Sequence, residues 1–141
     1  MFWALNSRIQ SAKNQKLIFL YNGFMNKKEF GTWAEDKTAE YFLTRGYKLI
    51  DRNLHYRCGE IDLIFEKDAN LLFVEVKARR NENFGAVVEA LTTQKLRKIQ
   101  QCVGRWRKES GDFRPGFIYF VGLIFENGKL RMHGQRVDIY A

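Results

Sequence analysis

The sequence contains little proline and little cysteine, and it has no long apolar run. One proline in 141 residues, with 45% apolar and 15% aromatic residues, excludes a disordered or collagen-like chain. No apolar run approaches the roughly 18 residues that a membrane-spanning helix needs. No repeat period is visible, which excludes solenoids, and the length suits one domain with one hydrophobic core.

The few cysteines and the start of the chain bear on the cell compartment. Cys58 and Cys102 are not a close pair in the sequence, and together with His55 and His133 they lack the C-x-x-C spacing of a zinc site. We expect two reduced thiols, as in cytosolic proteins. The apolar patch 17–21 is shorter than the core of a signal peptide, about 7–15 residues. The sequence therefore predicts a cytoplasmic protein without a membrane partner.

Charge is distributed unevenly along the chain. The net charge is +8, from 24 Lys and Arg against 16 Asp and Glu. Residues 31–76 carry nine acidic and six basic side chains, whereas residues 77–108 carry nine basic and two acidic ones. A basic segment attracts polyphosphate, because each neutralised phosphate releases condensed counterions. The same segment also fits an ordinary solvated helix face, so charge alone does not decide the function.

The spacing of apolar residues predicts two helices and five strands in the order αβββαββ. The first helix begins at Asn26, where Glu29 follows three residues later as in a capping box, and Gly46 ends it. The second helix, with apolar residues from Val88 to Trp106, is amphipathic. The predicted strands are 47–54, 59–66, 71–79, 117–125 and 129–139, the last two joined by Asn127-Gly128.

This order of elements predicts an α/β fold. Three strands before a crossover helix indicate a mixed sheet with helices packed on it. Residues 1–25 show no clear period, so we expect a poorly ordered extension there. Met25 could be a second start site, because the well-patterned sequence begins at that point. Residues 26–141 are therefore predicted to form a single domain.

The hairpin 59–79 can be given a register from its sequence. The turn is centred between Asp68 and Ala69, so the numbers of opposed residues sum to 137. One face is then entirely apolar and is predicted to be the core face, since a one-residue slip would mix the two sets. That face pairs Ile61 with Val76, Leu63 with Val74, and Phe65 with Leu72. The other face pairs Ile64 with Phe73, Asp62 with Glu75, and Glu60 with Lys77.

The pair Asp62 and Glu75 is the chemically unusual feature of this hairpin. Like charges directly opposite each other destabilise a sheet, unless a cation lies between them or one carboxylate takes up a proton. Converging carboxylate oxygens suit Mg²⁺ or Mn²⁺. Lys77 lies on the same face, where an ammonium could hold a scissile phosphate or orient an attacking water. The alternative is that these acidic residues are only the wet face of a sheet.

Two motifs in the hairpin resemble the signature of the YraN-like family of bacterial proteins. They are Gly59-Glu60-Ile61-Asp62-Leu63-Ile64 and Phe73-Val74-Glu75-Val76-Lys77-Ala78-Arg79. This family consists of predicted endonucleases, which are similar to archaeal Holliday-junction resolvases and to the PD-(D/E)xK nuclease superfamily. Supporting matches are Gly31, Glu35 and Ala39, then Gly46-Tyr47, Arg52-Asn53 and Phe84-Gly85. The resemblance covers roughly residues 27–106 and implies a restriction-endonuclease-like mixed β-sheet flanked by helices.

The resemblance also implies roles for individual residues. It makes Asp62 and Glu75 the ligands of Mg²⁺ or Mn²⁺ and Lys77 the catalytic lysine, with Glu35 as a further carboxylate near the metal. Glu35 could equally be a solvated helix residue. More weakly, Gln94 and Lys95 fall where the superfamily often places a polar residue. The basic side chains predicted to contact nucleic acid are Arg79, Arg80, Lys95, Arg97, Lys98, Arg105 and Arg107.

Two functions remain open at this stage. One is a divalent-metal-dependent DNA endonuclease, which is either selective for branched or recombination-type DNA or non-specific. The alternative is a catalytically inactive nucleic-acid-binding module of the same fold, which the replacement of the family's Arg-Phe-Asp by Tyr119-Phe120-Val121 slightly favours. A resolvase needs two active sites to cut two strands, so a homodimer is also considered. Phosphate-loop, hydrolase-elbow and His-Glu-x-x-His motifs are absent from the sequence.

Overall fold

The computed structural model describes residues 2–5, 25–80, 91–126 and 129–139. From α2 onward the element order is the predicted αβββαββ, and Phe2–Leu5 add one strand from the segment expected to be a poorly ordered extension. Residues 1 and 6–24, like the turn Asn127-Gly128, lie outside the described residues. The elements are β1 (Phe2–Leu5), α2 (Lys27–Leu43), β2 (Lys48–Tyr56), β3 (Gly59–Lys67), β4 (Asn70–Arg80), α4 (Thr93–Ser110), β5 (Gly116–Glu126) and β6 (Lys129–Asp138).

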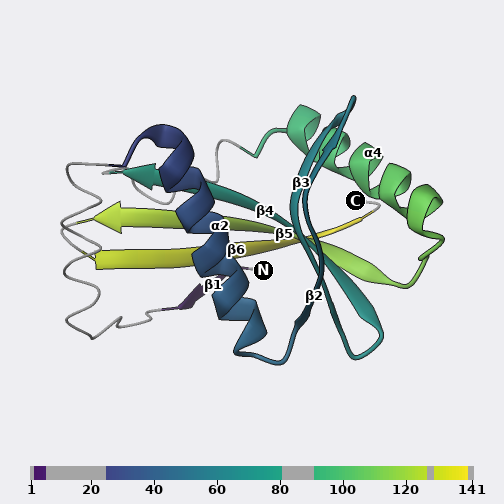
Figure 1. The fold of residues 1–141 in the computed structure, drawn as a ribbon, viewed down its shortest axis with the longest axis horizontal. Coiled ribbons are helices and arrows are strands. Elements are labelled where there is room, and N and C mark those ends of the chain that lie inside the picture. Colours follow the sequence, from purple (N-terminus) through teal and green to yellow (C-terminus); the bar gives the residue numbers. More distant parts are fainter. Residues whose placement is uncertain (1, 6–24, 81–90, 127–128, 140–141) are drawn as a thin grey trace.

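The strands form one mixed six-stranded sheet in the order β1-β6-β5-β4-β3-β2. Only the β4–β5 pair is parallel among the described strands, because α4 provides the crossover between them. Helix α2 crosses one face of the sheet, and the hairpin of β2 and β3 twists away from the sheet toward α4 (Figure 1). This architecture confirms the predicted mixed α/β fold and is consistent with a restriction-endonuclease-like fold.

Both faces of the sheet are buried, one under each helix. On the α4 side, the Trp106 ring packs edge-on against Phe73 with 5.5 Å between ring centroids. On the α2 side, the ring centroids of Phe42 and Phe65 lie 5.1 Å apart. The prediction of a single core face is therefore incomplete, since Ile64 and Phe73 on the other face are also fully buried. No helix among the described residues combines the length and apolarity that crossing a membrane requires.

The predicted register holds for the outer part of the β3–β4 hairpin and then stops. Five pairs follow it, from Lys67 with Asn70 to Leu63 with Val74. Beyond that point the ladder between β3 and β4 ends, whereas β4 remains paired with β5 as far as Arg80. The prediction that Ile61 shares a face with Leu63 is wrong, because Ile61 packs in the cluster under α4.

Local hydrogen bonds determine where both helices begin. Asn26 accepts from the Glu29 N–H and completes the predicted capping box. Helix α4 begins later than its apolar pattern predicted, because the Thr92 hydroxyl accepts from the Lys95 N–H and caps the helix there. Helix α2 ends at Leu43, earlier than expected, and the left-handed Gly46 lies in the turn that follows. These caps fix the positions of the side chains that follow them.

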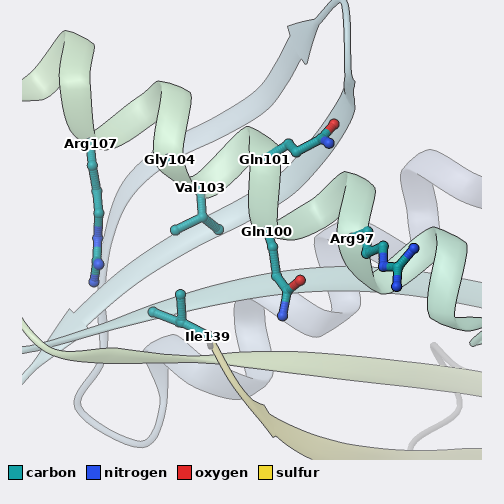
Figure 2. A pocket seen from close by; sticks show the side chains of 7 residues that line it. All are labelled: Arg97, Gln100, Gln101, Val103, Gly104, Arg107 and Ile139. Atoms are coloured by element: carbon teal, nitrogen blue, oxygen red, sulfur yellow. The ribbon is translucent and has the colours of Figure 1, made fainter. Parts of the chain in front are cut away.

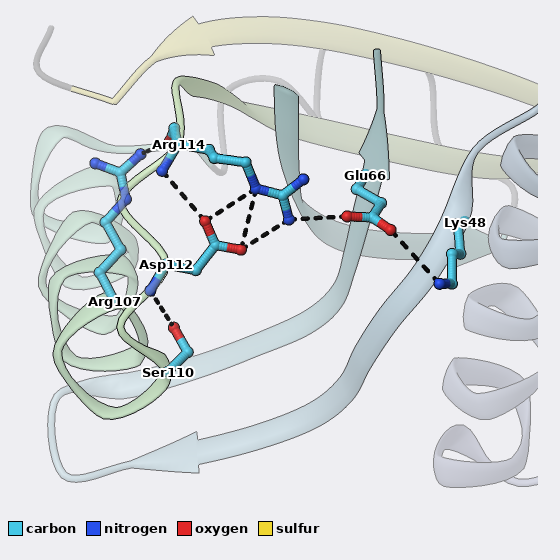
Figure 3. A network of polar contacts seen from close by, with 6 residues as sticks. All are labelled: Lys48, Glu66, Arg107, Ser110, Asp112 and Arg114. Atoms are coloured by element: carbon cyan, nitrogen blue, oxygen red, sulfur yellow. Dashed lines mark hydrogen bonds and ion pairs between the residues drawn. The ribbon is translucent and has the colours of Figure 1, made fainter. Parts of the chain in front are cut away.

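A polar network joins the end of α4 to β3 (Figure 3). Arg114 forms ion pairs with Asp112 at 2.7 Å and with Glu66 at 2.8 Å, and Glu66 also contacts Lys48. Arg107 is buried and donates to the Arg114 carbonyl oxygen at 2.7 Å. The network therefore fastens the connection between α4 and β5 to the neighbouring strands.

The turn between β2 and β3 rests on the middle of α4. Cys58 and Cys102, which are 44 positions apart in the sequence, bring their Sγ atoms to 3.1 Å from each other. They are free thiols, as expected, but they form a close pair in space. Gly59 beside them has a φ of 147°, and a Cβ at that position would lie 3.5 Å from the Cys102 sulfur. The turn thus approaches the helix closely at this point.

Two glycines provide a test of the packing between β4 and β5. We expect Gly116→Ala to destabilise the protein by about 1–3 kcal/mol, because the added Cβ would overlap the Leu71 carbonyl oxygen on the paired strand. Gly31→Ala is the matched control. Nothing lies within 4 Å of a Cβ at Gly31, so this substitution should stabilise α2 by about 0.5–1 kcal/mol. Urea unfolding measures both values, and equal effects of the two substitutions would contradict this packing.

Candidate active site

The candidate active site lies where β3 and β4 part. Asp62 on β3 is buried, with 8% of its surface exposed, and its Oδ2 accepts from the Val76 N–H at 2.7 Å. The Val76 N–H lies beyond the last β3–β4 pair, so β3 provides no backbone acceptor for it. The Asp62 carboxylate accepts this hydrogen bond instead, which fixes the side chain between the two strands. Glu75, one residue before Val76, lies beside Phe120 of β5.

Glu75 is nearly as buried as Asp62, but its carboxyl group has no hydrogen bond from the described backbone like the one that Asp62 accepts. Its side chain is 12% exposed, and its Oε2 has no hydrogen-bond partner among the described residues. Burial, followed by the nearby charge of Asp62, raises the pKa of Glu75 to about 8. Burial also raises the pKa of Asp62, although the hydrogen bond from Val76 opposes that shift. The two carboxyl groups are therefore close, desolvated and mutually repulsive when both are ionised.

Two ammonium groups face this carboxylate pair. The Lys95 Nζ on α4 lies 3.9 Å from the Glu75 Oε1 and 5.3 Å from the centre of the Phe120 ring. Burial, together with the neighbouring Lys77 ammonium, lowers the pKa of Lys95 to about 8. Lys77 is half-buried and close enough to Glu75 and Asp62 to lower the pKa of each. The structure thus brings together Asp62, Glu75 and Lys77, as predicted, and adds Lys95 to them.

Glu35 approaches the same region from α2. Burial, followed by the charge of Asp62, raises its pKa. The Arg52 Nη2 on β2 lies 3.7 Å from the Glu35 carboxylate and also forms an ion pair with Asp36. In the described part of the chain, no group of three or more acidic, histidine or cysteine side chains gathers closely enough to hold a metal ion. Glu35 is therefore a neighbour of the carboxylate pair, held by Arg52.

Sequence reasoning gave Arg52 no role of its own. The signal that could have identified Arg52 is the pairing of β2 with β3. In that hairpin Arg52 lies opposite Leu63, which is the residue after Asp62. An arginine next to two predicted carboxylates is a natural counter-ion, but the contribution of α2 to the same place could not be derived from the strands alone. The proximity of Lys95 to Glu75 depends in the same way on the packing of α4.

The residues predicted to bind nucleic acid lie in different environments. Arg97, Lys98 and Arg105 are exposed on α4, as is Gln94, which the resemblance marks only as a polar position of the superfamily. Arg97 and Arg107 lie near the two ends of a hollow of about 470 Å³ between α4 and Ile139 (Figure 2). Arg107 itself is 6% exposed, so little of it remains for contact with a phosphate. Arg79 is half-buried on β4, and the side chain of Arg80 lies outside the described residues.

The donor set fits a hard divalent cation. Asp62 and Glu75 supply carboxylate oxygens from adjacent strands, and the two carboxyl groups share a hydrogen bond while Glu75 keeps its proton. No other described donor lies against the Glu75 Oε2. Mg²⁺ and Mn²⁺ prefer such oxygen ligands and retain several waters. The neighbouring ammonium groups can hold an anion such as a phosphate beside the carboxylates. The arrangement is therefore able to bring a cation and a phosphate ester together.

The raised pKa of Glu75 makes a prediction about the stability of the metal-free protein. A carboxyl group with a native pKa of about 8 and an ordinary value of 4.5 stabilises the fold fully below pH 4.5. That contribution is lost as the pH rises through 8. We therefore expect the melting temperature, measured with a chelator present, to fall between pH 5 and pH 8.5. The melting temperature of the Glu75→Gln variant should fall less over this pH range. That of the Glu60→Gln variant, which changes an exposed side chain near the end of the strand, should fall as in the wild type. Parallel curves for Glu75→Gln and the wild type would contradict this assignment.

Comparisons with known proteins identify the family. The model of the uncharacterised protein family UPF0102 matches residues 34–141. A UPF0102 protein of Syntrophomonas wolfei is 38% identical over 107 residues, which are 75% of this chain and 93% of that protein. A UPF0102 protein of Vibrio campbellii is 36% identical over 109 residues, 76% of this chain and 89% of its own. One from Sulfurihydrogenibium is 39% identical over 102 residues, 70% and 89% of the two chains. The chain therefore belongs to the uncharacterised protein family UPF0102, the YraN-like family that its hairpin motifs resemble.

Proposed function

We propose that this protein is a divalent-metal-dependent DNA endonuclease that hydrolyses phosphodiester bonds. One observation carries the proposal. The parting of β3 and β4 leaves the buried Asp62 carboxylate beside the nearly buried Glu75 carboxylate, one oxygen of which accepts from no donor among the described residues. Desolvation and mutual repulsion make this carboxylate pair destabilising to the fold. The ammonium groups of Lys77 and Lys95 beside it would attract an anionic substrate.

Asp62 and Glu75 would hold Mg²⁺ or Mn²⁺ through their carboxylate oxygens. When bound there, such an ion would lower the pKa of a water molecule and would neutralise charge on the phosphate. At neutral pH the raised pKa of Glu75 keeps this carboxyl group protonated. Metal binding would therefore release its proton to solvent and leave Glu75 as a charged carboxylate. The hydrogen bond from Val76 fixes the Asp62 carboxylate throughout.

The remaining residues have positioning and electrostatic roles. Lys77 stabilises the negative charge that develops on the phosphoryl oxygens in the transition state. Lys95 contacts Glu75 and keeps a positive charge next to it, which favours the ionised carboxylate. Arg52 holds Glu35 close to Asp62, where the Glu35 carboxylate can orient water.

The substrate follows from the charge of the molecule and from the resemblance of its motifs. The exposed cations Arg97, Lys98 and Arg105 lie on the same helix as Lys95 and suit the phosphate backbone of DNA. The resemblance to junction resolvases favours branched or recombination-type DNA. A cytoplasmic location and a homodimer that cuts two strands belong to the same proposal.

The second candidate function is a nucleic-acid-binding module without catalysis. Two observations favour it. No third ligand residue gathers at the carboxylate pair within the described residues. On β5, Tyr119 and Val121 flank the Phe120 that pairs with Glu75, and they stand in place of the arginine and the aspartate of the family pattern. This function predicts DNA binding that is indifferent to Mg²⁺ and to the charge of Asp62.

A cleavage assay separates the two functions. Purified protein is incubated with labelled duplex, flap, fork, four-way junction and single-stranded DNA in Mn²⁺ or Mg²⁺. We expect metal-dependent cutting, reduced about 10²–10³-fold by Lys77→Ala, because one group that stabilises transition-state charge is lost. Asp62→Asn should abolish cutting, since a metal ligand is lost, and both variants should bind DNA nearly as well as the wild type.

Glu60→Gln is the matched control for Asp62→Asn. It removes one carboxylate from the same strand, two residues away, where the side chain is exposed and contacts His55. Its cutting rate should equal that of the wild type. If the wild type binds these DNAs but leaves all of them intact in both metals, the binding module replaces the nuclease.

A further inference from the structure

A groove of about 890 Å³ lies between the β2–β3 turn and α4, and none of the residues that line it belongs to the candidate active site. We call it the turn groove. One wall is the turn with the end of β2, residues 55–58, and the other is the C-terminal half of α4, from Gln101 to Glu109. Gly104 lies in the helix wall, and nothing comes within 4 Å of the place that a Cβ would occupy there, so no neighbouring side chain covers this part of the wall.

Three strong cations line the turn groove from both walls. Arg57 comes from the turn, and Arg105 and Lys108 come from the helix. The Arg105 Nε donates to the Glu109 Oε1 at 2.8 Å, so this carboxylate is already engaged. Arg57 and Lys108 are exposed and form no hydrogen bond or ion pair with any described residue. Two uncommitted cations therefore face one groove from elements that are distant in the sequence.

The turn groove and the carboxylate pair are connected by α4. Lys95 at the start of this helix contacts Glu75, and Arg97 and Lys98 are exposed in the next turn. At 1.5 Å per residue, Arg105 and Lys108 lie about 15–20 Å along the helix axis from Lys95. One strand of B-form DNA advances about 3.4 Å per nucleotide along its axis, so this distance corresponds to roughly four to six base pairs.

We propose that the turn groove binds the phosphodiester backbone of duplex DNA about four to six base pairs from the phosphate that Lys77 and Lys95 would hold beside the carboxylate pair. The inference rests on the proposed function and deepens it, because it assigns the substrate a double-stranded region and a direction along α4. Arg57 and Lys108 each neutralise one phosphate. The hairpin turn, which rests on α4 through Cys58, positions Arg57 opposite the helix.

The test measures how DNA binding depends on salt. Fluorescence anisotropy gives the association constant for a labelled duplex over a series of salt concentrations, with a chelator present so that no DNA is cut. We expect the double variant Arg57→Ala with Lys108→Ala to reduce the slope of log K against log salt by about 1.8, since each lost phosphate contact removes about 0.9. Both side chains are exposed, so the fold should be kept, which the melting temperature verifies.

Two further variants make the result specific. Lys27→Ala with Lys28→Ala removes the same charge from the start of α2, on the opposite face of the sheet, and should leave the slope unchanged. Arg57→Lys with Lys108→Arg exchanges the two cations and should retain the wild-type slope. A slope that stays at the wild-type value in the first double variant, or falls equally in the α2 control, would overturn the proposal.

The outcome is independent of whether the protein cuts DNA. The binding measurement needs no metal and no cleavage, so a failure of the nuclease proposal leaves it interpretable. If the protein does cleave, the rate at saturating DNA should be the same for the wild type and the turn-groove variant. A large loss of that rate would place Arg57 or Lys108 in the catalytic step and would contradict a role in binding alone.

Discussion

The hydrogen bond from the Val76 N–H to the Asp62 carboxylate holds the candidate site together. It forms where the β3–β4 ladder ends, and it satisfies a backbone donor that would otherwise be buried without a partner. Strand β4 continues along β5, whereas β3 turns toward α4. The space that opens between β3 and β4 can therefore hold a side chain. Asp62 fills this gap, and the same geometry places it against Glu75. The electrostatic strain of the site thus follows from a change in strand pairing.

The two helices complete this environment from opposite faces. Helix α4 brings Lys95 to Glu75, and its position is fixed by the Thr92 cap at one end and by the polar network around Arg114 at the other. Helix α2 brings Glu35, which Arg52 holds in place. The carboxylate pair, its two lysines, Glu35 and Arg52 are thereby brought together from five elements, α2, β2, β3, β4 and α4. Removing the buried charge of one carboxylate should stabilise the apo protein, as expected for groups retained for function rather than for folding.

Much of this arrangement was predictable from local patterns. The register of the outer part of the hairpin, from Lys67 with Asn70 to Leu63 with Val74, follows from alternation around the turn. The α2 cap follows from Asn26 and Glu29. What sequence reasoning missed depends on tertiary packing. The transfer of Ile61 to the α4 side requires the strands to part, which no alternation pattern encodes. The Cys58–Cys102 contact requires the turn to rest on α4, and the burial of Arg107 depends on the loop that carries Arg114.

The central claim is that the parted strands form a divalent-cation site from Asp62 and Glu75. Calorimetric titration of the metal-free protein with Mn²⁺ at pH 7, in two buffers of different ionisation enthalpy, tests it most directly. The account predicts one bound ion and the release of close to one proton, because the Glu75 pKa of about 8 keeps this group protonated beforehand. Binding should be lost in Glu75→Gln and Asp62→Asn and retained in Glu60→Gln. Binding that survives both substitutions, or that releases no proton, would contradict the account.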